Sequence, residues 1–217
     1  MMRSLILFAL VNNVFCWNPN SYPFLPASAD STKVRNLIIE AQGPGKRILD
    51  IGCGLGYSTS DATGCVGIDR NKYTVQKAQK LFPEKKFRHS FTNDGFPDEQ
   101  YDVVTCMFYL NDLPQYLRKQ TIESAINLAE ERVVVVDIAP DYKPDKDLLR
   151  ARSYVPDYMK NCRHDLADFK EQVLVDGLLN IWIYDKSDKV IVNKKTILNN
   201  HKINKDKFSK MGCELAY

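Results

Sequence analysis

The sequence predicts a three-layer, doubly wound α/β fold, in which a seven-stranded, mostly parallel sheet ends in a C-terminal antiparallel hairpin. Three observations predict it. The chain has 217 residues, of which 44% are hydrophobic, enough for one ordinary domain with a sizeable core. Strand-like and helix-like segments alternate along it. Residues 133–136 are four consecutive valines, and such a run without polar alternation indicates a strand covered on both faces, as in a parallel sheet.

The elements of the first half each have a local signal. Apolar residues at helical spacing predict a helix over residues 31–41. Short apolar runs predict strands over residues 47–51 and 65–69. Asn71 is a good N-cap for a helix over residues 72–81. This alternation places the first two strands next to each other in a parallel sheet.

The second half continues the alternation and then changes to a hairpin. Its expected elements, in order, are strands over 86–91 and 101–107, a long helix that begins near Pro114, a strand over 132–138, a polar and partly helical segment over 139–168, and strands over 169–175 and 178–184. The last two strands are joined at Asp176-Gly177, a dipeptide that favours a tight turn. They therefore form the antiparallel hairpin.

The net charge of +3 hides two unlike regions. Residues 186–217 hold eight lysines and three acids, whereas residues 1–185 hold 22 Lys and Arg against 24 acids. The body, residues 17–185, is thus slightly acidic, so a nucleic acid is not expected as its partner. Residues 186–217 are interpreted as a Lys-rich tail, either solvated or a docking arm.

The first sixteen residues have the outline of a secretory signal peptide. A short basic start precedes an apolar run over residues 5–11, which is followed by a tolerable cleavage site near Cys16. A buried N-terminal helix or an interfacial segment is the alternative. No stretch is long and apolar enough for a membrane span, so we expect a soluble protein.

The cysteines predict buried free thiols. Cys53, Cys65 and Cys106 lie in apolar, strand-like runs, and no Cys-x-x-Cys pair or histidine at zinc-ligand spacing accompanies them. We therefore expect no metal site and no disulfide framework.

The chemistry is expected where the first strand ends. This strand leads through Asp50 into three glycines at alternate positions, Gly52, Gly54 and Gly56. Glycines let a backbone turn sharply and approach a ligand closely. The second strand ends in Asp69, whose carboxylate is placed to accept hydrogen bonds from the two hydroxyls of a ribose.

Two nucleotide cofactors use this layout. The dinucleotide fingerprint needs a glycine three positions after its second one, and here that position is Tyr57. The carboxylate of Asp50 also disfavours a pyrophosphate. It suits S-adenosylmethionine, which carries an ammonium, a sulfonium and no phosphate.

On these residues the sequence resembles the class I S-adenosylmethionine-dependent methyltransferases, which have a Rossmann-like fold. The resemblance covers roughly residues 30–185. Within the superfamily it is similar to the small-molecule group that includes quinone-biosynthesis methyltransferases (methyltransferase type 11), through the run 101–114 and the strand Val133 to Asp137.

The resemblance implies roles for particular residues. Those expected to hold the methionine part of the cofactor are Asp50, Gly52, Gly54, Gly56 and, from the fourth strand, Cys106 to Phe108. It places Asp69 at the ribose, and Ser90 and Phe91 at the adenine. Ser90 stands where the family usually has an aspartate, and the eight residues between Gly56 and Cys65 require a short first helix. These departures leave a cofactor-binding pseudoenzyme open.

No catalytic residue is assigned from the sequence. Four side chains are expected near the mouth of the site, Asn111, Asp112, Asp137 and His164. Asp112 is alternatively a helix cap, and His164 a solvated residue. Because the run after the fourth strand lacks an Asn/Asp-Pro-Pro-aromatic motif, we expect a small organic acceptor. A macromolecular acceptor, protein or RNA, docked through the basic tail, is the alternative function.

Overall fold

A computed structural model describes residues 31–57, 59, 64–90 and 99–188 of the chain. The chain forms two compact units, Met1–Tyr184 and Asp185–Tyr217. The first unit holds the sheet and its helices. The expected signal segment, residues 1–16, lies outside the described residues, and so does the Lys-rich tail apart from its first three residues.

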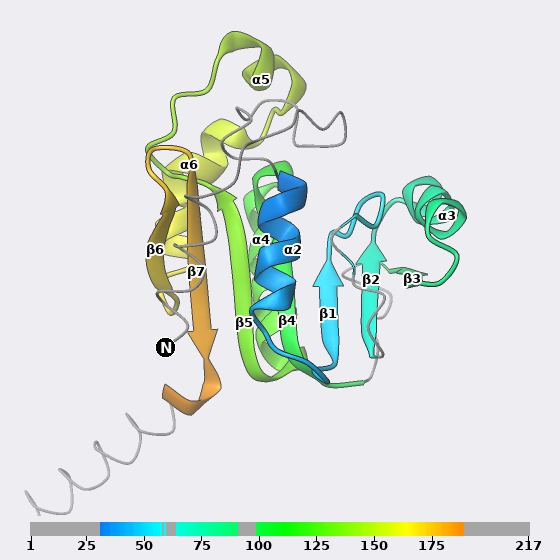
Figure 1. The fold of residues 1–217 in the computed structure, drawn as a ribbon. Helices are drawn as coiled ribbons and strands as arrows, with labels where there is room; N and C mark the ends of the chain where they lie inside the picture. The colour runs from blue at the N-terminus through cyan, green and yellow to red at the C-terminus, as the bar shows by residue number, and fades with distance from the viewer. Residues whose placement is uncertain (1–30, 58, 60–63, 91–98, 189–217) are drawn as a thin grey trace, which may run out of the picture. The chain divides into compact units, whose positions relative to one another are not determined.

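The described sheet has seven strands in the order β3-β2-β1-β4-β5-β7-β6 (Figure 1). Their bounds are β1 Ile48–Ile51, β2 Cys65–Asp69, β3 Lys86–His89, β4 Tyr101–Met107, β5 Ala129–Ile138, β6 Lys170–Val175 and β7 Leu179–Asp185. The neighbours from β3 to β5 pair in parallel, and β6 pairs with β7 in antiparallel fashion. The predicted fold class is confirmed.

The strand order reverses between β1 and β4, and this point defines where a ligand can bind. Successive crossovers run outward from β1 through β2 to β3, and then the chain returns to β4 on the other side of β1. In doubly wound sheets, ligands bind outside the carboxyl ends of the strands at such a switch point. The loops after β1, β2 and β4 therefore bound the expected site.

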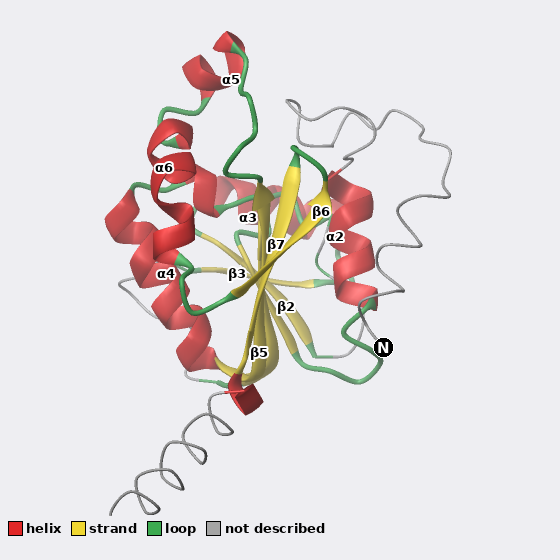
Figure 2. Cartoon of the chain, turned by 90° about the vertical axis from the view of Figure 1, so that its left-hand side faces the viewer, coloured by secondary structure: helices red, strands yellow, loops and turns green. Residues whose placement is uncertain are grey.

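Helices cover both faces of the sheet. The described ones are α2 Ser31–Glu40, α3 Lys72–Leu81, the 3₁₀ turn η2 Leu110–Asp112, α4 Gln115–Leu128, α5 Lys146–Ala151 and α6 Val155–Asp165. Figure 2 shows α2 on one face and α4 and α6 on the other. No described helix has the length and apolar character needed to cross a membrane.

The core lies between these layers and is centred on the middle strands. The four valines of β5 are at most 1% exposed, as predicted from their unbroken run. On the neighbouring strands, Leu49 and Val104 are also fully buried. At about 25 cal/mol per Å² of buried apolar surface, such side chains supply most of the favourable free energy of folding.

One predicted helix cap is confirmed and another is wrong. The Asn71 side chain accepts hydrogen bonds from the backbone N–H groups of Tyr73 and Thr74, and so caps α3. Asp112 does not cap the following helix, because Pro114 is the N-cap residue of α4 and Asp112 lies in η2. Asp112 lies two positions before the N-cap position, where a side chain can reach the first free N–H groups.

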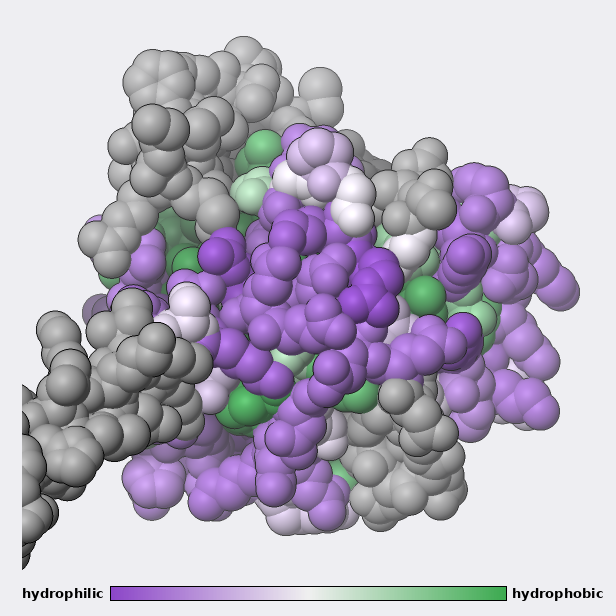
Figure 3. Space-filling model, turned by 90° about the horizontal axis from the view of Figure 1, so that it is seen from below, coloured by the Kyte–Doolittle hydropathy of each residue, from purple (hydrophilic) through white to green (hydrophobic). Residues whose placement is uncertain are grey.

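The amino ends of the strands form the opposite, polar end of the first unit. Ion pairs join Lys46 to Glu131, and Arg47 to both Asp102 (3.3 Å) and Glu130 (3.2 Å). Seen from below, this end is mostly hydrophilic (Figure 3). These exposed pairs contribute little stability, and the chemistry-bearing residues lie at the other end.

Candidate functional site

Asp50 anchors the site from inside the sheet. Its side chain is fully buried in β1. The hydroxyl of Thr59 donates to Oδ2 at 3.1 Å, and the hydroxyl of Thr105 in β4 donates to Oδ1 at 3.0 Å. A buried carboxylate needs such donors to offset its lost hydration. Asp50 therefore provides a fixed negative charge just below the glycine turn.

The three glycines of the turn have different surroundings. All have positive φ, +73° at Gly52, +56° at Gly54 and +82° at Gly56, a region that favours glycine. A Cβ on Gly52 would lie 2.3 Å from Cγ of Tyr109, and one on Gly56 would lie 2.4 Å from Cζ of Phe87. A Cβ on Gly54 would meet no described atom within 4 Å. Gly54 is therefore the open position of the turn.

Asp69 holds the glycine turn to the start of α3. Its Oδ2 accepts from the Gly54 N–H at 3.1 Å, and its Oδ1 accepts from the Asn71 N–H at 2.8 Å. Each carboxylate oxygen has a second lone-pair direction. Asp69 is half-buried, so it keeps acceptor capacity on the side of the turn. The backbone N–H of Ser90 donates to the Asp69 carbonyl at 3.2 Å, which brings the end of β3 beside it.

Only one of the two residues predicted to contact the adenine lies among the described residues. Ser90 follows β3 and is half-buried, whereas Phe91 lies outside the described residues. The short first helix expected between Gly56 and Cys65 falls largely on residues 58 and 60–63, which are also outside them.

Arg35 is a candidate site residue that the sequence reasoning missed. It comes from α2, and its guanidinium lies 5.2 Å from the centre of the Phe108 ring. Burial lowers the pKa of Arg35, while the charges of Asp50 and Asp137 act in the opposite direction. Arg35 therefore places a cation among the carboxylates at the strand ends. The sequence around Arg35 indicates only a short amphipathic helix. Its nearness to the strand ends arises when α2 packs on the sheet, which no local pattern predicts.

The ends of β4 and β5 carry a second buried carboxylate. Asp137 is fully buried and accepts from the Asn111 backbone N–H (3.2 Å), the Asn111 side-chain amide (2.5 Å) and the Ile138 N–H (2.8 Å). Burial raises its pKa to about 6, against these hydrogen bonds, which lower it. Cys106, nearby on β4, is a buried free thiol whose pKa burial raises well above its ordinary value. Cys106 is therefore an uncharged residue that packs beside the site.

The segment after β5 covers this end of the sheet (Figure 1). Arg152, between α5 and α6, pairs with Asp112 of η2. The hydroxyl of Tyr158 in α6 donates to the Ile138 carbonyl at 3.2 Å. Tyr158 is fully buried, so its role is packing rather than lining a pocket. The cover is thus tied to the ends of β4 and β5.

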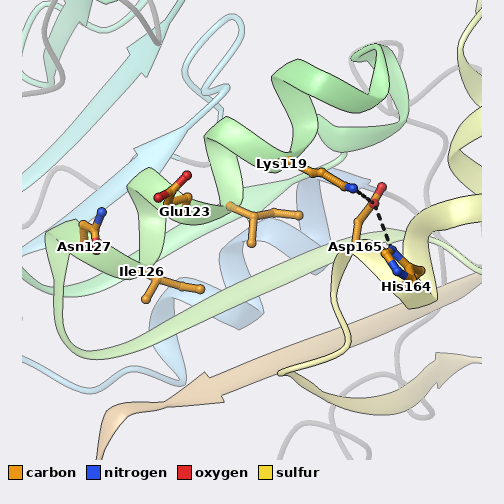
Figure 4. Close-up of a pocket in the computed structure, with 7 residues that line it drawn as sticks. Lys119, Glu123, Ile126, Asn127, His164 and Asp165 are labelled. Atoms are coloured by element: carbon orange, nitrogen blue, oxygen red, sulfur yellow. Dashed lines mark ion pairs between the residues drawn. The ribbon is translucent and has the colours of Figure 1, made fainter.

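His164 does not join the site. Its side chain is 81% exposed, as expected of a solvated residue, and its Nδ1 lies 3.8 Å from Asp165 Oδ1. With Lys119 and Asp165 it lines a shallow groove between α4 and α6 of about 240 Å³ (Figure 4). This groove lies on the face of the sheet that α4 and α6 cover, away from the glycine turn. The candidates at the mouth are therefore Asn111, Asp112 and Asp137.

Comparisons with known proteins agree with this geometry. A family model described as a methyltransferase domain matches residues 49–130, which include the glycine turn, Asp69 and β4. The matched residues form a methyltransferase domain, and together with the similar proteins below they indicate an S-adenosylmethionine-dependent methyltransferase. A similar solved structure contains S-adenosylhomocysteine, which supports S-adenosylmethionine as the cofactor, in agreement with the sequence prediction.

A curated relative is 235L of Invertebrate iridescent virus 6, named as a candidate methyltransferase. It is 27% identical over 120 residues, which are 52% of this chain and 44% of the relative. The chain thus matches less than half the length of that protein, and the match supports the domain rather than a shared substrate.

Solved structures show the same fold. CurJ carbon methyltransferase is similar with a TM-score of 0.54 and 18% identity, over 73% of this chain and 54% of that one. Magnesium protoporphyrin IX methyltransferase from Synechocystis PCC 6803, with bound S-adenosylhomocysteine, has a TM-score of 0.50 and 18% identity, over 70% and 80%. A TehB-like methyltransferase from Corynebacterium glutamicum is similar with a TM-score of 0.50 and 17% identity, over 70% of this chain and 87% of that one.

Proposed function

We propose that the protein transfers a methyl group from S-adenosylmethionine to a small organic acceptor. The observation that carries the proposal is the bond between Asp69 and Gly54. It fixes an open glycine, with no described atom within 4 Å of its missing Cβ, beside a half-buried carboxylate at the switch point of the sheet. A ligand with a ribose and a cationic amino-acid part fits these groups.

The residues around the turn match the charges of this cofactor. Asp50 and Asp137 supply negative charge for an ammonium and a sulfonium, and Arg35 supplies a cation for a carboxylate. Asp69 has acceptor directions for ribose hydroxyls, and Ser90 adds a polar side chain next to it. In this assignment Gly52 and Gly56 shape the turn, and Gly54 is the glycine that the cofactor approaches.

Bound there, S-adenosylmethionine supplies a methyl group on a sulfonium, already activated for in-line displacement. The task of the chain is then alignment and exclusion of water. Asn111, held by Asp137, fixes the loop after β4, and the segment over residues 139–165 covers the acceptor side. Asp137 is fully buried and already accepts three hydrogen bonds, so we assign it a positioning role rather than that of a general base.

A small acceptor is favoured because the cover is small. Residues 139–165 contain only two short helices, and Tyr158, Leu148 and Val155 are fully buried in the core. No separate substrate domain stands among the described residues. We therefore place the acceptor beside η2, under this cover.

Calorimetric titration with S-adenosylmethionine and S-adenosylhomocysteine is the first test. We expect micromolar binding, weakened by at least tenfold in Asp69→Ala, with the exposed acid Asp147→Ala as matched control. Transfer of a radiolabelled methyl group to a panel of phenols, quinols, amines and carboxylic acids then identifies the acceptor class. Absence of binding at millimolar cofactor would refute the proposal.

A macromolecular acceptor is the second candidate, favoured by a basic edge formed by α3 and β3. Residues 70–89 contain seven Lys or Arg and a single acid, Glu84. Lys77 and Lys80 follow the exposed Tyr73 at helical spacing, on the side of α3 opposite the buried Val75. Such a stripe suits a phosphate backbone.

This candidate is tested with the full chain and labelled single-stranded RNA. Lys72→Glu/Lys77→Glu/Lys80→Glu should abolish RNA binding and methylation, whereas Lys143→Glu/Lys146→Glu/Lys160→Glu, with the same charge change elsewhere, should not. If both triple variants lost RNA binding and methylation equally, the binding would depend only on net charge, and the macromolecular acceptor would be rejected. The predicted docking role of residues 186–217 falls on a segment outside the described residues, apart from its first three.

A further inference from the structure

The side chain of Tyr109 lies on the first glycine of the turn. Three of its atoms, Cγ, Cδ2 and Cβ, would be 2.3, 2.5 and 2.8 Å from a Cβ on Gly52. These distances place the ring and its root in direct contact with the Gly52 backbone. Any larger residue at position 52 would collide with them.

The electrostatic neighbours of the Tyr109 hydroxyl come from the ends of three strands. The charged and ionisable groups that act on the Tyr109 hydroxyl are Cys106 of β4, Asp69 at the end of β2, Arg70 directly after it, and Cys53 after β1. Burial raises the pKa of the Tyr109 hydroxyl, so it is neutral at physiological pH. The ring thus lies across the switch point, between the turn and Asp69.

The backbone before Tyr109 explains how the ring comes to lie there. Phe108 has φ +55°, in the left-handed region that a bulky residue adopts only under constraint, at about 1–3 kcal/mol. Its N–H donates to the Val136 carbonyl at 2.7 Å, and the Tyr109 carbonyl accepts from the Asp112 N–H at 3.1 Å. These bonds hold the turn on both sides. As a result, the Phe108 ring packs against Arg35 and the Tyr109 ring packs against Gly52.

A ligand that binds at the turn meets this ring. Gly54, which is bonded to Asp69, is open on its Cβ side, whereas Gly52 is covered by Tyr109. The methionine part of a cofactor seated on Asp69 and Gly54 extends toward the ends of β1 and β4, where Tyr109 lies. The ring and that part of the ligand cannot both occupy the space on the Cβ side of Gly52.

We propose that Tyr109 is a gate on the methionine end of the cofactor cleft, whose ring leaves Gly52 when the cofactor enters. The proposal rests on the proposed function for the identity of the ligand. It goes beyond it by naming a residue that limits cofactor affinity. A protein that must first move a packed side chain binds with an affinity reduced by the fraction of molecules in which the ring has moved.

Three full-length variants test the gate by calorimetry with S-adenosylhomocysteine. Tyr109→Ala removes the ring and should bind about tenfold more tightly than the natural chain. Tyr109→Phe keeps the ring and should bind as the natural chain does. Tyr116→Ala, which removes a 66% exposed tyrosine from α4, is the matched control and should also leave the affinity unchanged.

A second readout separates the gate from loss of packing. Tyr109→Ala should unfold at a lower temperature than the natural chain, because it loses the contact with Gly52, yet saturating S-adenosylhomocysteine should raise its unfolding temperature by a larger increment. If Tyr109→Ala folds poorly, Tyr109→Leu serves instead. It keeps apolar volume and should show the same direction.

Weaker or unchanged binding in Tyr109→Ala overturns the gate. Weaker binding would make the ring a wall that the cofactor uses, and unchanged binding would make the contact irrelevant to it. Both results leave the proposed function intact. No binding in the natural chain or in any variant refutes the proposed function and the gate together.

Discussion

Asn111 donates two hydrogen bonds to the carboxylate of Asp137, one from its backbone N–H to Oδ2 (3.2 Å) and one from its side-chain amide to Oδ1 (2.5 Å). Both residues are fully buried. The pair joins the carboxyl end of β5 to the 3₁₀ turn after β4. It therefore fixes the loop that lies between the cofactor turn and the acceptor side.

This pair should make stability depend on pH in an unusual direction. The pKa of Asp137 is raised to about 6 in the folded chain, against about 3.9 when unfolded. Between these values the native state binds more protons, so the contribution of Asp137 to stability falls as pH rises from about 4 to 6. The loss is on the order of 3 kcal/mol. Urea unfolding of the natural chain and of Asp137→Asn at pH 4.5 and 7.5 measures it.

Asp137→Asn has the shape of the protonated acid and does not ionise, so its unfolding free energy should lack this loss. The difference in unfolding free energy between the two proteins should therefore shift in favour of the variant between pH 4.5 and pH 7.5. A constant difference between the two proteins at both pH values would contradict the raised pKa.

Arg118 should be the most sensitive charged residue in the helical layer. Its side chain is fully buried, with Nε 2.7 Å from Oδ2 of the equally buried Asp165, Nη2 2.9 Å from Asp157 and Nη1 donating to the Leu113 carbonyl at 2.9 Å. Arg118→Ala leaves the Asp165 charge buried without its guanidinium, which costs about 3–5 kcal/mol. Chemical denaturation should show this loss. Lys119→Ala, next to it and 53% exposed, should change stability by about 0.5 kcal/mol at most.

Thr105 should couple sheet stability to cofactor binding. Its hydroxyl is buried and donates to Asp50 at 3.0 Å. Thr105→Val keeps the shape but leaves Asp50 with one donor fewer, so we expect a loss of about 1–3 kcal/mol in unfolding free energy. Cofactor affinity should fall with it, because Asp50 is less firmly held. Thr121→Val, a buried threonine of α4 whose hydroxyl has no partner among the described residues, is the control and should be neutral or stabilising. Equal losses in both variants would exclude a special role for the Asp50 bond.

The parts of the fold that depend on local patterns were predictable. The strand Tyr101–Met107 has the predicted bounds, and Asn71 caps α3 as expected, because both follow from neighbours in the sequence. The nearness of Asp69 to the glycine turn was also predictable, because β1 and β2 are adjacent parallel strands whose carboxyl ends lie at one edge of the sheet.

The rest of the site depends on contacts between distant segments. Arg35 reaches the strand ends only because α2 packs on the sheet, and Tyr109 covers Gly52 only because Phe108 adopts a left-handed backbone. Asp112 resembled a helix cap, yet its partner is Arg152, forty residues further along the chain. No local pattern contains these pairings.

The ion pair of Asp112 and Arg152 should control the acceptor side without changing cofactor binding. It joins η2 to the segment between α5 and α6, and both side chains are about one quarter exposed. A double-mutant cycle of Asp112→Asn and Arg152→Gln should give a coupling of about 0.5–1 kcal/mol in stability, because the pair is only partly shielded from water. Once an acceptor is identified, each single variant should raise its KM several-fold, while the Kd of S-adenosylhomocysteine stays unchanged. The exposed pair of Asp147 and Arg150 in α5, 3.4 Å apart, is the matched control. Loss of cofactor affinity in Asp112→Asn would place the pair at the cofactor rather than at the acceptor.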